Sequence, residues 1–237
     1  MTSDQRMLGA VRAAARTAVL DAWAVLMPTQ CSGCGTPDRA LCAACVSALR
    51  AEPRAVYRED LTIWSAVEYS GVVSRVLVAY KDGGRTDAAP ALAAALRQAV
   101  GAALVAADPA QTPGGVVLVT VPSSRRAWRA RGFHPVDLLL GRAGLRGSAL
   151  LRPCAGVADQ VGLGRQQRLD NRSGTLAATR PLAGSRIVLV DDIVTTGATL
   201  LEARRALRQA GGEVIGAATV AETRRLHPDI HRSRETD

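Results

Sequence analysis

A run of apolar residues, two acids and a hydroxyl-rich turn follow one another at residues 187–199, and this segment constrains the fold most. It consists of Ile-Val-Leu-Val-Asp-Asp-Ile-Val-Thr-Thr-Gly-Ala-Thr. Four consecutive apolar residues are typical of a strand buried on both faces, as in parallel sheets covered by helices. Helical and strand patterns alternate along the chain, so we expect an α/β fold with a mostly parallel sheet flanked by helices. Ligands of such sheets bind at the carboxyl ends of the strands, where the two acids stand.

The chemistry of this segment suits a ribose 5-phosphate. Backbone N–H groups at a turn that opens a helix favour a phosphate, and a glycine in the turn allows close approach. Asp191 and Asp192 can accept hydrogen bonds from the ribose hydroxyls and help to hold the magnesium that pyrophosphate brings. The residues expected at the phosphate are Thr195, Thr196, Gly197, Ala198 and Thr199.

The alternative is a generic strand end followed by a threonine N-cap. A Walker A loop is excluded, because no GxxxxGK[ST] pattern is present. The segment resembles, at every class of position, the motif with which type I phosphoribosyltransferases bind 5-phosphoribosyl-1-pyrophosphate (PRPP).

Two basic segments are expected to hold the pyrophosphate of the same ligand. After an apolar run at residues 116–121, a loop at residues 122–134 offers Arg125, Arg129 and Arg131. Lys81 is the only lysine among 30 basic residues, and it could bring a compact ammonium to the polyanion. A solvated loop and a surface turn are the alternatives for the two segments. Residues 160–171 are expected to form a mobile flap over the site.

Two CxxC pairs separated by seven residues indicate a small zinc module at residues 29–50. Its ligands would be Cys31, Cys34, Cys42 and Cys45. Four thiolates leave no open position for water, so the role would be structural, and the metal would supply much of the folding energy. A disulfide pair, a redox CxxC and cysteines that bind nothing are the alternatives, the first being disfavoured in a cytoplasmic chain. Cys154 lies apart and is treated as an ordinary free cysteine.

Taken together, these segments resemble the ComF family, in which a CxxC…CxxC zinc module precedes a type I phosphoribosyltransferase fold. The family's motifs appear in order as the cysteines at 31–45, Tyr-Lys-Asp-Gly-Gly-Arg at 80–85, Val-Pro at 121–122, Arg-Ala-Arg-Gly-Phe at 129–133, Gln-Val-Gly-Leu at 160–163, Arg168 with Asn171, and the PRPP motif. The resemblance implies a link to the uptake and handling of transforming DNA. His134 stands where the family usually has asparagine, so the pyrophosphate loop departs from the family pattern in that detail.

The expected organisation follows from these segments. Residues 1–28 are predicted as an amphipathic N-terminal helix, 29–50 as the zinc module, 51–62 as a charged connector, 63–222 as the phosphoribosyltransferase-type domain and 223–237 as a flexible tail. Within the domain, strands are expected at 63–69, 116–121, 150–152, 186–190 and 214–220, and helices at 72–80, 90–107, 135–145 and 198–210. His227 and His231 are assigned to the exposed tail. No apolar run reaches the length of a membrane span and the first residues make a poor secretory signal, so we expect a cytoplasmic protein without membrane insertion.

The sequence leaves two main functions open. As an enzyme, the chain would transfer a phosphoribosyl group, with Asp191 and Asp192 fixing ribose and metal while the basic residues stabilise the leaving pyrophosphate; nothing identifies the acceptor. As a non-catalytic protein, it would sense PRPP and handle single-stranded DNA, together with DNA-uptake proteins, on a surface of net charge +9. With 3% aromatic residues, such binding would rest on arginine–phosphate contacts and depend on salt. A transcriptional regulator is disfavoured, because no helix-turn-helix signature is present.

Overall fold

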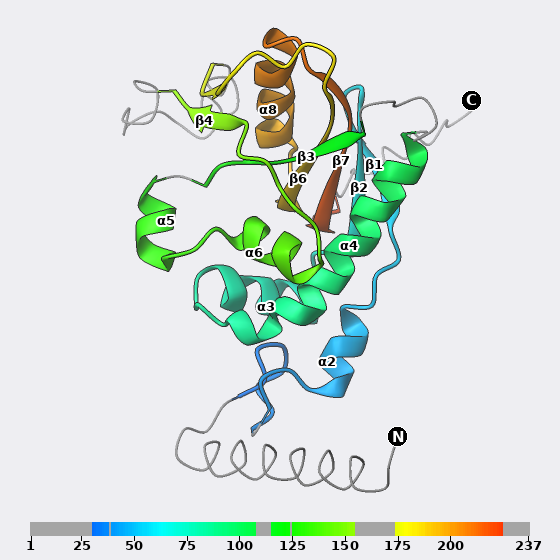
Figure 1. Cartoon of the computed structure of the whole chain (residues 1–237). Helices are drawn as coiled ribbons and strands as arrows, with labels where there is room; N and C mark the ends of the chain where they lie inside the picture. Colours follow the sequence, from blue (N-terminus) through cyan, green and yellow to red (C-terminus); the bar gives the residue numbers. More distant parts are fainter. Residues whose placement is uncertain (1–29, 38, 108–114, 124, 155–173, 225–237) are drawn as a thin grey trace, which may run out of the picture.

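The computed structural model describes residues 30–224 except 38, 108–114, 124 and 155–173, and within them a five-stranded sheet forms the centre of the molecule (Figure 1). Its strand order is β1-β2-β7-β6-β3. Four strands run parallel: β2 (Leu61–Glu68), β7 (Glu213–Glu222), β6 (Arg186–Val194) and β3 (Val116–Thr120). The fifth, β1 (Arg54–Arg58), pairs antiparallel with β2 at the edge. The predicted mostly parallel sheet flanked by helices is confirmed.

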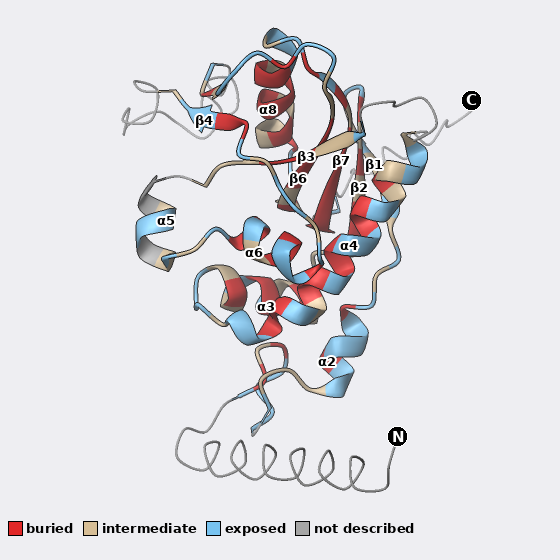
Figure 2. Ribbon diagram, viewed as in Figure 1, coloured by how far each residue is buried: buried red, intermediate tan, exposed pale blue. Residues whose placement is uncertain are grey.

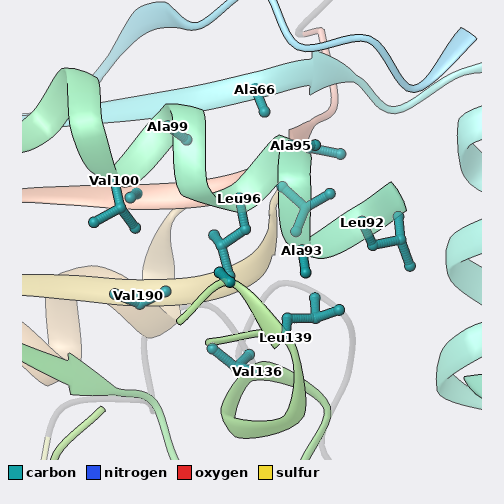
Figure 3. Close-up of a cluster of buried hydrophobic side chains, with 14 of the residues drawn as sticks. Ala66, Leu92, Ala93, Ala95, Leu96, Ala99, Val100, Val136, Leu139 and Val190 are labelled. Atoms are coloured by element: carbon teal, nitrogen blue, oxygen red, sulfur yellow. The ribbon is translucent and has the colours of Figure 1, made fainter. Parts of the chain in front are cut away.

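One face of the sheet is covered by α4 (Ala89–Ala106), with α3 (Gly71–Lys81) and α6 (Pro135–Arg142) beside it. Alanines and leucines of α4 pack there between β2, β6 and α6, as Figure 3 shows for Leu96, Val190 and Leu139. By length and composition alone, the segment Thr86–Ala106 could cross a membrane, contrary to the expectation that no apolar run is long enough. Its buried residues pack against the sheet, however, as those of a core helix do.

The other face is covered by α8 (Ala198–Gln209) and by a small antiparallel pair, β4 (Leu151–Pro153) and β5 (Leu176–Ala178). Figure 2 shows buried and exposed residues alternating along α4, whereas α8 is buried along most of its length and exposed only at its C-terminal end. The apolar residues of β6 alternate between the two layers: Val188 and Val190 belong to the α4 side, Ile187 and Leu189 to the α8 side. The strand is therefore buried on both faces, as its sequence predicts.

Three elements differ from the sequence-based expectation. The segment 51–62 contains β1 and the start of β2 instead of a connector, because residues 55–57, Ala-Val-Tyr, find a pairing partner in the next strand. The basic segment 122–134 contains a helix, α5 (Arg125–Arg131), since its alanines and arginines are good helix formers. The helix that begins at Pro135 ends at Arg142, before the turn at Gly144 with φ +72°.

Candidate functional site

The two acids of the predicted site lie within β6, whereas the sequence predicts that they follow it. Pairing with β7 continues to Val194. Pairing with β3 ends at Val190, whose carbonyl accepts a hydrogen bond from the N–H of Val121 (3.2 Å). Asp191 and Asp192 therefore lie on the part of β6 that has no ladder with β3, next to the segment that leaves β3.

Lys81 and Asp192 form an ion pair that joins the end of α3 to β6. Lys81 Nζ lies 2.8 Å from a carboxylate oxygen of Asp192, whose side chain is only 11% exposed. The backbone N–H of Asp192 donates to the Asp191 carboxylate (2.9 Å). Asp191 is partly exposed as a residue, whereas its carboxyl group is buried by the surrounding protein. Its removal from water, followed by the charge of Asp192, raises the pKa of Asp191 to about 7, while the Asp192 N–H and the Lys81 ammonium act in the opposite direction.

The turn between β6 and α8 has the geometry of an anion cradle. Thr195 and Thr196 are exposed, and Gly197 has φ +84°, a conformation that L residues rarely adopt. The N–H of Ala198 donates to Thr196 Oγ1 (3.3 Å) as the helix begins. Thr199 lies in the first helical turn and is partly buried. Because α8 is twelve residues long, its N-terminal end favours an anion at this turn.

Arg58, which sequence analysis did not single out, covers this turn. Its Nε and Nη2 donate to the carbonyl oxygen of Thr195 at 3.2 and 3.0 Å. Its aliphatic stem lies so close to Gly197 that a Cβ at that glycine would come within 2.6 Å of Arg58 Cγ. The sequence suggests that this glycine admits a ligand, but its close neighbour in the structure is the arginine. The strand-forming residues 55–57 were the signal that could have revealed β1, and with it the arginine at its end.

The predicted pyrophosphate-binding arginines lie on α5. Arg125 begins this helix, and its side chain is outside the described part of the structure. Arg129 is exposed to solvent. Arg131 is largely buried, with Nε 3.8 Å from a carboxylate oxygen of Asp82. The structure therefore brings Arg131 next to the residue that follows Lys81, while Arg129 lies on the outer side of the same helix.

Two segments that are separate in the sequence meet at Tyr80. This tyrosine is fully buried, and its hydroxyl donates to the carbonyl of Pro135 (2.7 Å). Its ring centroid lies 5.7 Å from that of Phe133. The end of α3 is thereby packed against the segment that connects α5 to α6. Lys81, at the end of α3, and Arg131, on α5, thus lie on neighbouring elements.

Trp128 and His134 form an exposed aromatic pair beside the arginines of α5. Trp128 is 46% exposed. The two ring centroids are 6.3 Å apart, with an interplanar angle of 30°. A turn at Gly132, with φ +74° and its N–H bonded to the Trp128 carbonyl (2.8 Å), brings the two rings together. From the low aromatic content, the sequence predicted binding through arginine–phosphate contacts alone; the pairing of these two rings depends on this turn and could not be read from it.

The arginine of the 80–85 segment contacts the cysteine segment instead of the acids. Arg85 Nη2 donates to the carbonyls of Gln30 (2.9 Å) and Ala40 (3.4 Å). From α3, Arg75 donates to the carbonyl of Gly33. These contacts dock the cysteine segment, which includes α2 (Ala43–Ala48), against α3, and Figure 1 shows it on the far side of α3 from the sheet. The same helix therefore contacts the acidic pair and the cysteine segment.

The four N-terminal cysteines converge as a metal centre requires. Their Sγ atoms all lie within 4.8 Å of one another. Cys34 Sγ and Cys42 Sγ are 3.7 Å apart, and tetrahedral Zn–S bonds of about 2.3 Å would place sulfurs about 3.8 Å apart. All five cysteines of the chain are free thiols in the structure, which does not support the disulfide alternative. The set fits a tetrahedral thiolate site for a structural metal.

The surroundings of the cysteines also fit a bound cation. Burial raises the pKa of Cys31, but the N–H donors of Cys42, Cys34 and Gly33 outweigh it and lower the pKa to about 6. Burial raises the pKa of Cys45. A Cβ at Gly33 would lie 2.6 Å from Cys45 Sγ, so only glycine fits the knuckle as it is built. A cation at the centre would hold all four sulfurs as thiolates.

Several expectations fall on residues outside the described part of the chain. They are the N-terminal helix, the flap at residues 160–171, and the tail with His227 and His231. Cys154 is described: it is partly exposed, and its N–H donates to the carbonyl of Thr175 (2.8 Å).

Sequence comparison relates the chain to known proteins. A family model described as the phosphoribosyl transferase domain matches residues 152–233, which include β6, the two acids, the turn and α8. The chain is 33% identical over 159 residues to the DNA utilization protein YhgH of Salmonella typhi, a match that covers 64% of this chain and 67% of that protein. It is also 51% identical to the orotate phosphoribosyltransferase of Mycobacterium avium, but over 41 residues, or 17% of this chain and 23% of that enzyme.

The solved structures that resemble this chain include two adenine phosphoribosyltransferases. The enzyme from Rhodothermus marinus aligns with a TM-score of 0.29 and 16% identity, covering 76% of this chain and 88% of that one. The enzyme from Leishmania tarentolae aligns with a TM-score of 0.34 and 10% identity, covering 72% of this chain and 94% of that one.

Proposed function

This chain belongs to the ComF family, that of the DNA utilization protein YhgH, and on this basis we propose that it is a phosphoribosyltransferase-like protein that binds PRPP with Mg²⁺. The observation that carries the proposal is the ion pair between Lys81 and Asp192, 2.8 Å long, beside the turn that opens α8. One ammonium, two carboxylates and a helix N-terminus match the three parts of PRPP: pyrophosphate, ribose and 5-phosphate.

Each part of the ligand has its own residues in this proposal. The 5-phosphate binds at the turn of residues 195–199. Asp191 and Asp192 accept hydrogen bonds from the ribose hydroxyls and supply oxygen ligands for Mg²⁺. The pyrophosphate is held by Lys81, Arg125, Arg129 and Arg131. The contact of Arg131 with Asp82, at 3.8 Å, supports grouping the α5 arginines with the end of α3.

In the enzymatic form of the proposal, a nitrogen nucleophile attacks C1 of the ribose from the face opposite the pyrophosphate. The C1–N bond forms as the C1–O bond breaks, and both electrons of the broken bond leave with pyrophosphate. Lys81 and the arginines stabilise the negative charge of the leaving group, and the two aspartates hold the ribose as positive charge develops on its ring. Bound magnesium would neutralise further charge on the pyrophosphate. The acceptor is not specified by the proposal.

The four-cysteine centre is proposed to hold a structural Zn²⁺. Its ligands are Cys31, Cys34, Cys42 and Cys45, whose mutual distances fit a tetrahedral site. The metal would fold a segment that has little core of its own and would keep its backbone carbonyls in place for Arg75 and Arg85. The centre therefore supports α3 and takes no part in the chemistry.

Calorimetric titration of the zinc-loaded full chain with Mg-PRPP tests the proposal. Wild-type protein should bind, and the Asp191→Asn, Asp192→Asn double variant should not. A Glu52→Gln, Glu213→Gln double variant is the matched control, because it removes two exposed carboxylates (side chains 77% and 66% exposed) that pair with Arg54 and Arg186 and not with Lys81. Absence of binding to folded wild type would refute the proposal.

A second function is favoured by the exposed aromatic pair of Trp128 on α5 and His134. In this alternative the protein senses PRPP without catalysis and handles single-stranded DNA in the cytoplasm, in keeping with the name of its Salmonella relative. Trp128, 46% exposed, could stack on bases, Arg129 could contact phosphates, and the net charge of +9 favours polyanions. Release of pyrophosphate with a nitrogenous base would support the enzyme. DNA retention that survives the double aspartate substitution but is lost in Trp128→Ala would support the alternative.

A further inference from the structure

The turn between β1 and β2 is fastened to α8. Glu59 in this turn has φ +53°, a conformation uncommon for a non-glycine residue. Its carboxylate lies 3.4 Å from Arg204 of α8. Asp60 forms an ion pair with the same arginine and lies 3.5 Å from Arg208. The edge hairpin is thus held against α8, whose N-terminus forms the turn of residues 195–199, called here the phosphate turn. The hairpin lies outside the family-model match at residues 152–233.

From this hairpin, Arg58 reaches the phosphate turn itself. Two of its nitrogens bond to the Thr195 carbonyl at 3.2 and 3.0 Å, and the third, Nη1, donates to the Tyr57 carbonyl (2.9 Å). All three guanidinium nitrogens therefore bond backbone oxygens. The side chain is thereby held by the protein, so its effect on a ligand passes through the backbone of the turn.

Because a trans peptide is planar, the contact of Arg58 with the Thr195 carbonyl also fixes the direction of the Thr196 N–H. The C=O of residue 195 and the N–H of residue 196 belong to one planar unit and point to opposite sides. With the Thr195 oxygen held toward Arg58, the Thr196 N–H points away from the hairpin. The stem of Arg58 also lies against Gly197, with its Cγ within 2.6 Å of where a Cβ would be.

We infer that Arg58 is a positioning residue that orients the turn of residues 195–199 for a phosphate. This inference rests on the proposed function and deepens it by adding a residue from the edge hairpin to the 5-phosphate site. Without Arg58, the peptide between residues 195 and 196 is free to rotate and to present a carbonyl oxygen to the phosphate. The pyrophosphate side of the site, on α3 and α5, makes no use of this contact.

The inference predicts a selective loss of affinity. Arg58→Met keeps an unbranched apolar stem and removes the guanidinium. Its affinity for ribose 5-phosphate should fall about tenfold, as expected for the loss of charge-assisted hydrogen bonds. Its affinity for magnesium pyrophosphate should stay within about twofold of wild type. Arg54→Met is the matched control: it removes the same charge from the same strand, but this side chain is 63% exposed and pairs with Glu52. It should leave both affinities unchanged.

Both ligands are titrated separately by calorimetry into zinc-loaded, full-length protein, and hydrogen exchange of residues 195–201 is measured without ligand. Faster exchange confined to this segment in Arg58→Met supports the inference, and Arg58→Lys repeats the test if the methionine variant does not fold. Unchanged ribose 5-phosphate affinity, or an equal loss for both ligands, overturns the role of Arg58 while the proposed function stands. A wild type that binds neither ligand overturns both.

Discussion

Replacing Lys81 by methionine probes the ion pair at the centre of the proposed site. Lys81 is the only lysine of the 237-residue chain, and its ammonium lies 2.8 Å from Asp192. The substitution keeps most of the stem and removes the charge. The Asp192 carboxylate, 11% exposed, then stands beside Asp191 without its nearest counter-charge. Both the stability of the ligand-free protein and its affinity for PRPP should fall.

The magnitude follows from the exposure of the pair. Breaking a fully buried ion pair costs about 3–5 kcal/mol. The Lys81 side chain is 25% exposed, so water screens part of its interaction with Asp192. We therefore expect a loss of about 2 kcal/mol in the free energy of unfolding, or about 4–8 °C in the thermal midpoint for a domain of this size. Loss of one charged hydrogen bond to the pyrophosphate should weaken PRPP binding about 10- to 150-fold.

The lone lysine also provides a direct assay. An amine-selective reagent can modify only the Lys81 side chain and the N-terminal amine, which peptide mass spectrometry separates. Mg-PRPP should protect Lys81 from the reagent and leave the N-terminal amine reactive. In Lys81→Met, thermal unfolding measures the loss of stability and calorimetry measures the loss of PRPP affinity. Lys81→Arg keeps the charge in a bulkier group, so its stability and its PRPP affinity should lie between those of wild type and Lys81→Met. Wild-type stability together with wild-type PRPP affinity in Lys81→Met would refute the reasoning.

Three further outcomes are expected. Burial raises the pKa of Asp191 from 3.8 to about 7, so between these pH values the folded state holds a proton that the unfolded chain has lost, and stability falls as pH rises. In magnesium-free denaturation, Asp191→Asn should therefore gain stability relative to wild type from about pH 4 to 7; a constant difference would contradict this. Cys45→Ser should lower the zinc content measured by elemental analysis, and full occupancy would argue against the four-thiolate centre. Tyr80→Phe loses the 2.7 Å hydrogen bond to Pro135 and should cost about 1 kcal/mol in chemical denaturation, whereas no change would show that this bond does not contribute.

The order of elements was predictable because it follows from local pattern. The apolar run before Asp191 indicates a doubly buried strand, and Pro135 indicates a helix start; both are found. The cysteine spacing predicted a cluster, and the four Sγ atoms do converge. Such features depend on the periodicity and covalent geometry of a few neighbouring residues, so a single sequence contains them.

The neighbours of the predicted residues were decided by tertiary structure. The sequence predicts Lys81 and Arg85 as cations of one basic segment, yet one contacts the acids and the other the cysteine segment. The three residues between them turn the chain at the end of α3, and the direction of the second side chain depends on how the cysteine segment docks. That docking is a long-range contact, which no local pattern specifies.

Arg58 illustrates the same division most clearly. In the sequence it is one of many arginines, within a segment that predicted only a charged connector. Its contact with Thr195 spans 137 residues and exists because β1 pairs with β2 and their turn is bound to α8. Sequence by itself determined the chemistry available at the turn of residues 195–199, the proposed phosphate site, because that chemistry belongs to consecutive residues. Only the folded sheet decided which distant side chain holds the turn in place, because that choice depends on the pairing of strands and the packing of a helix.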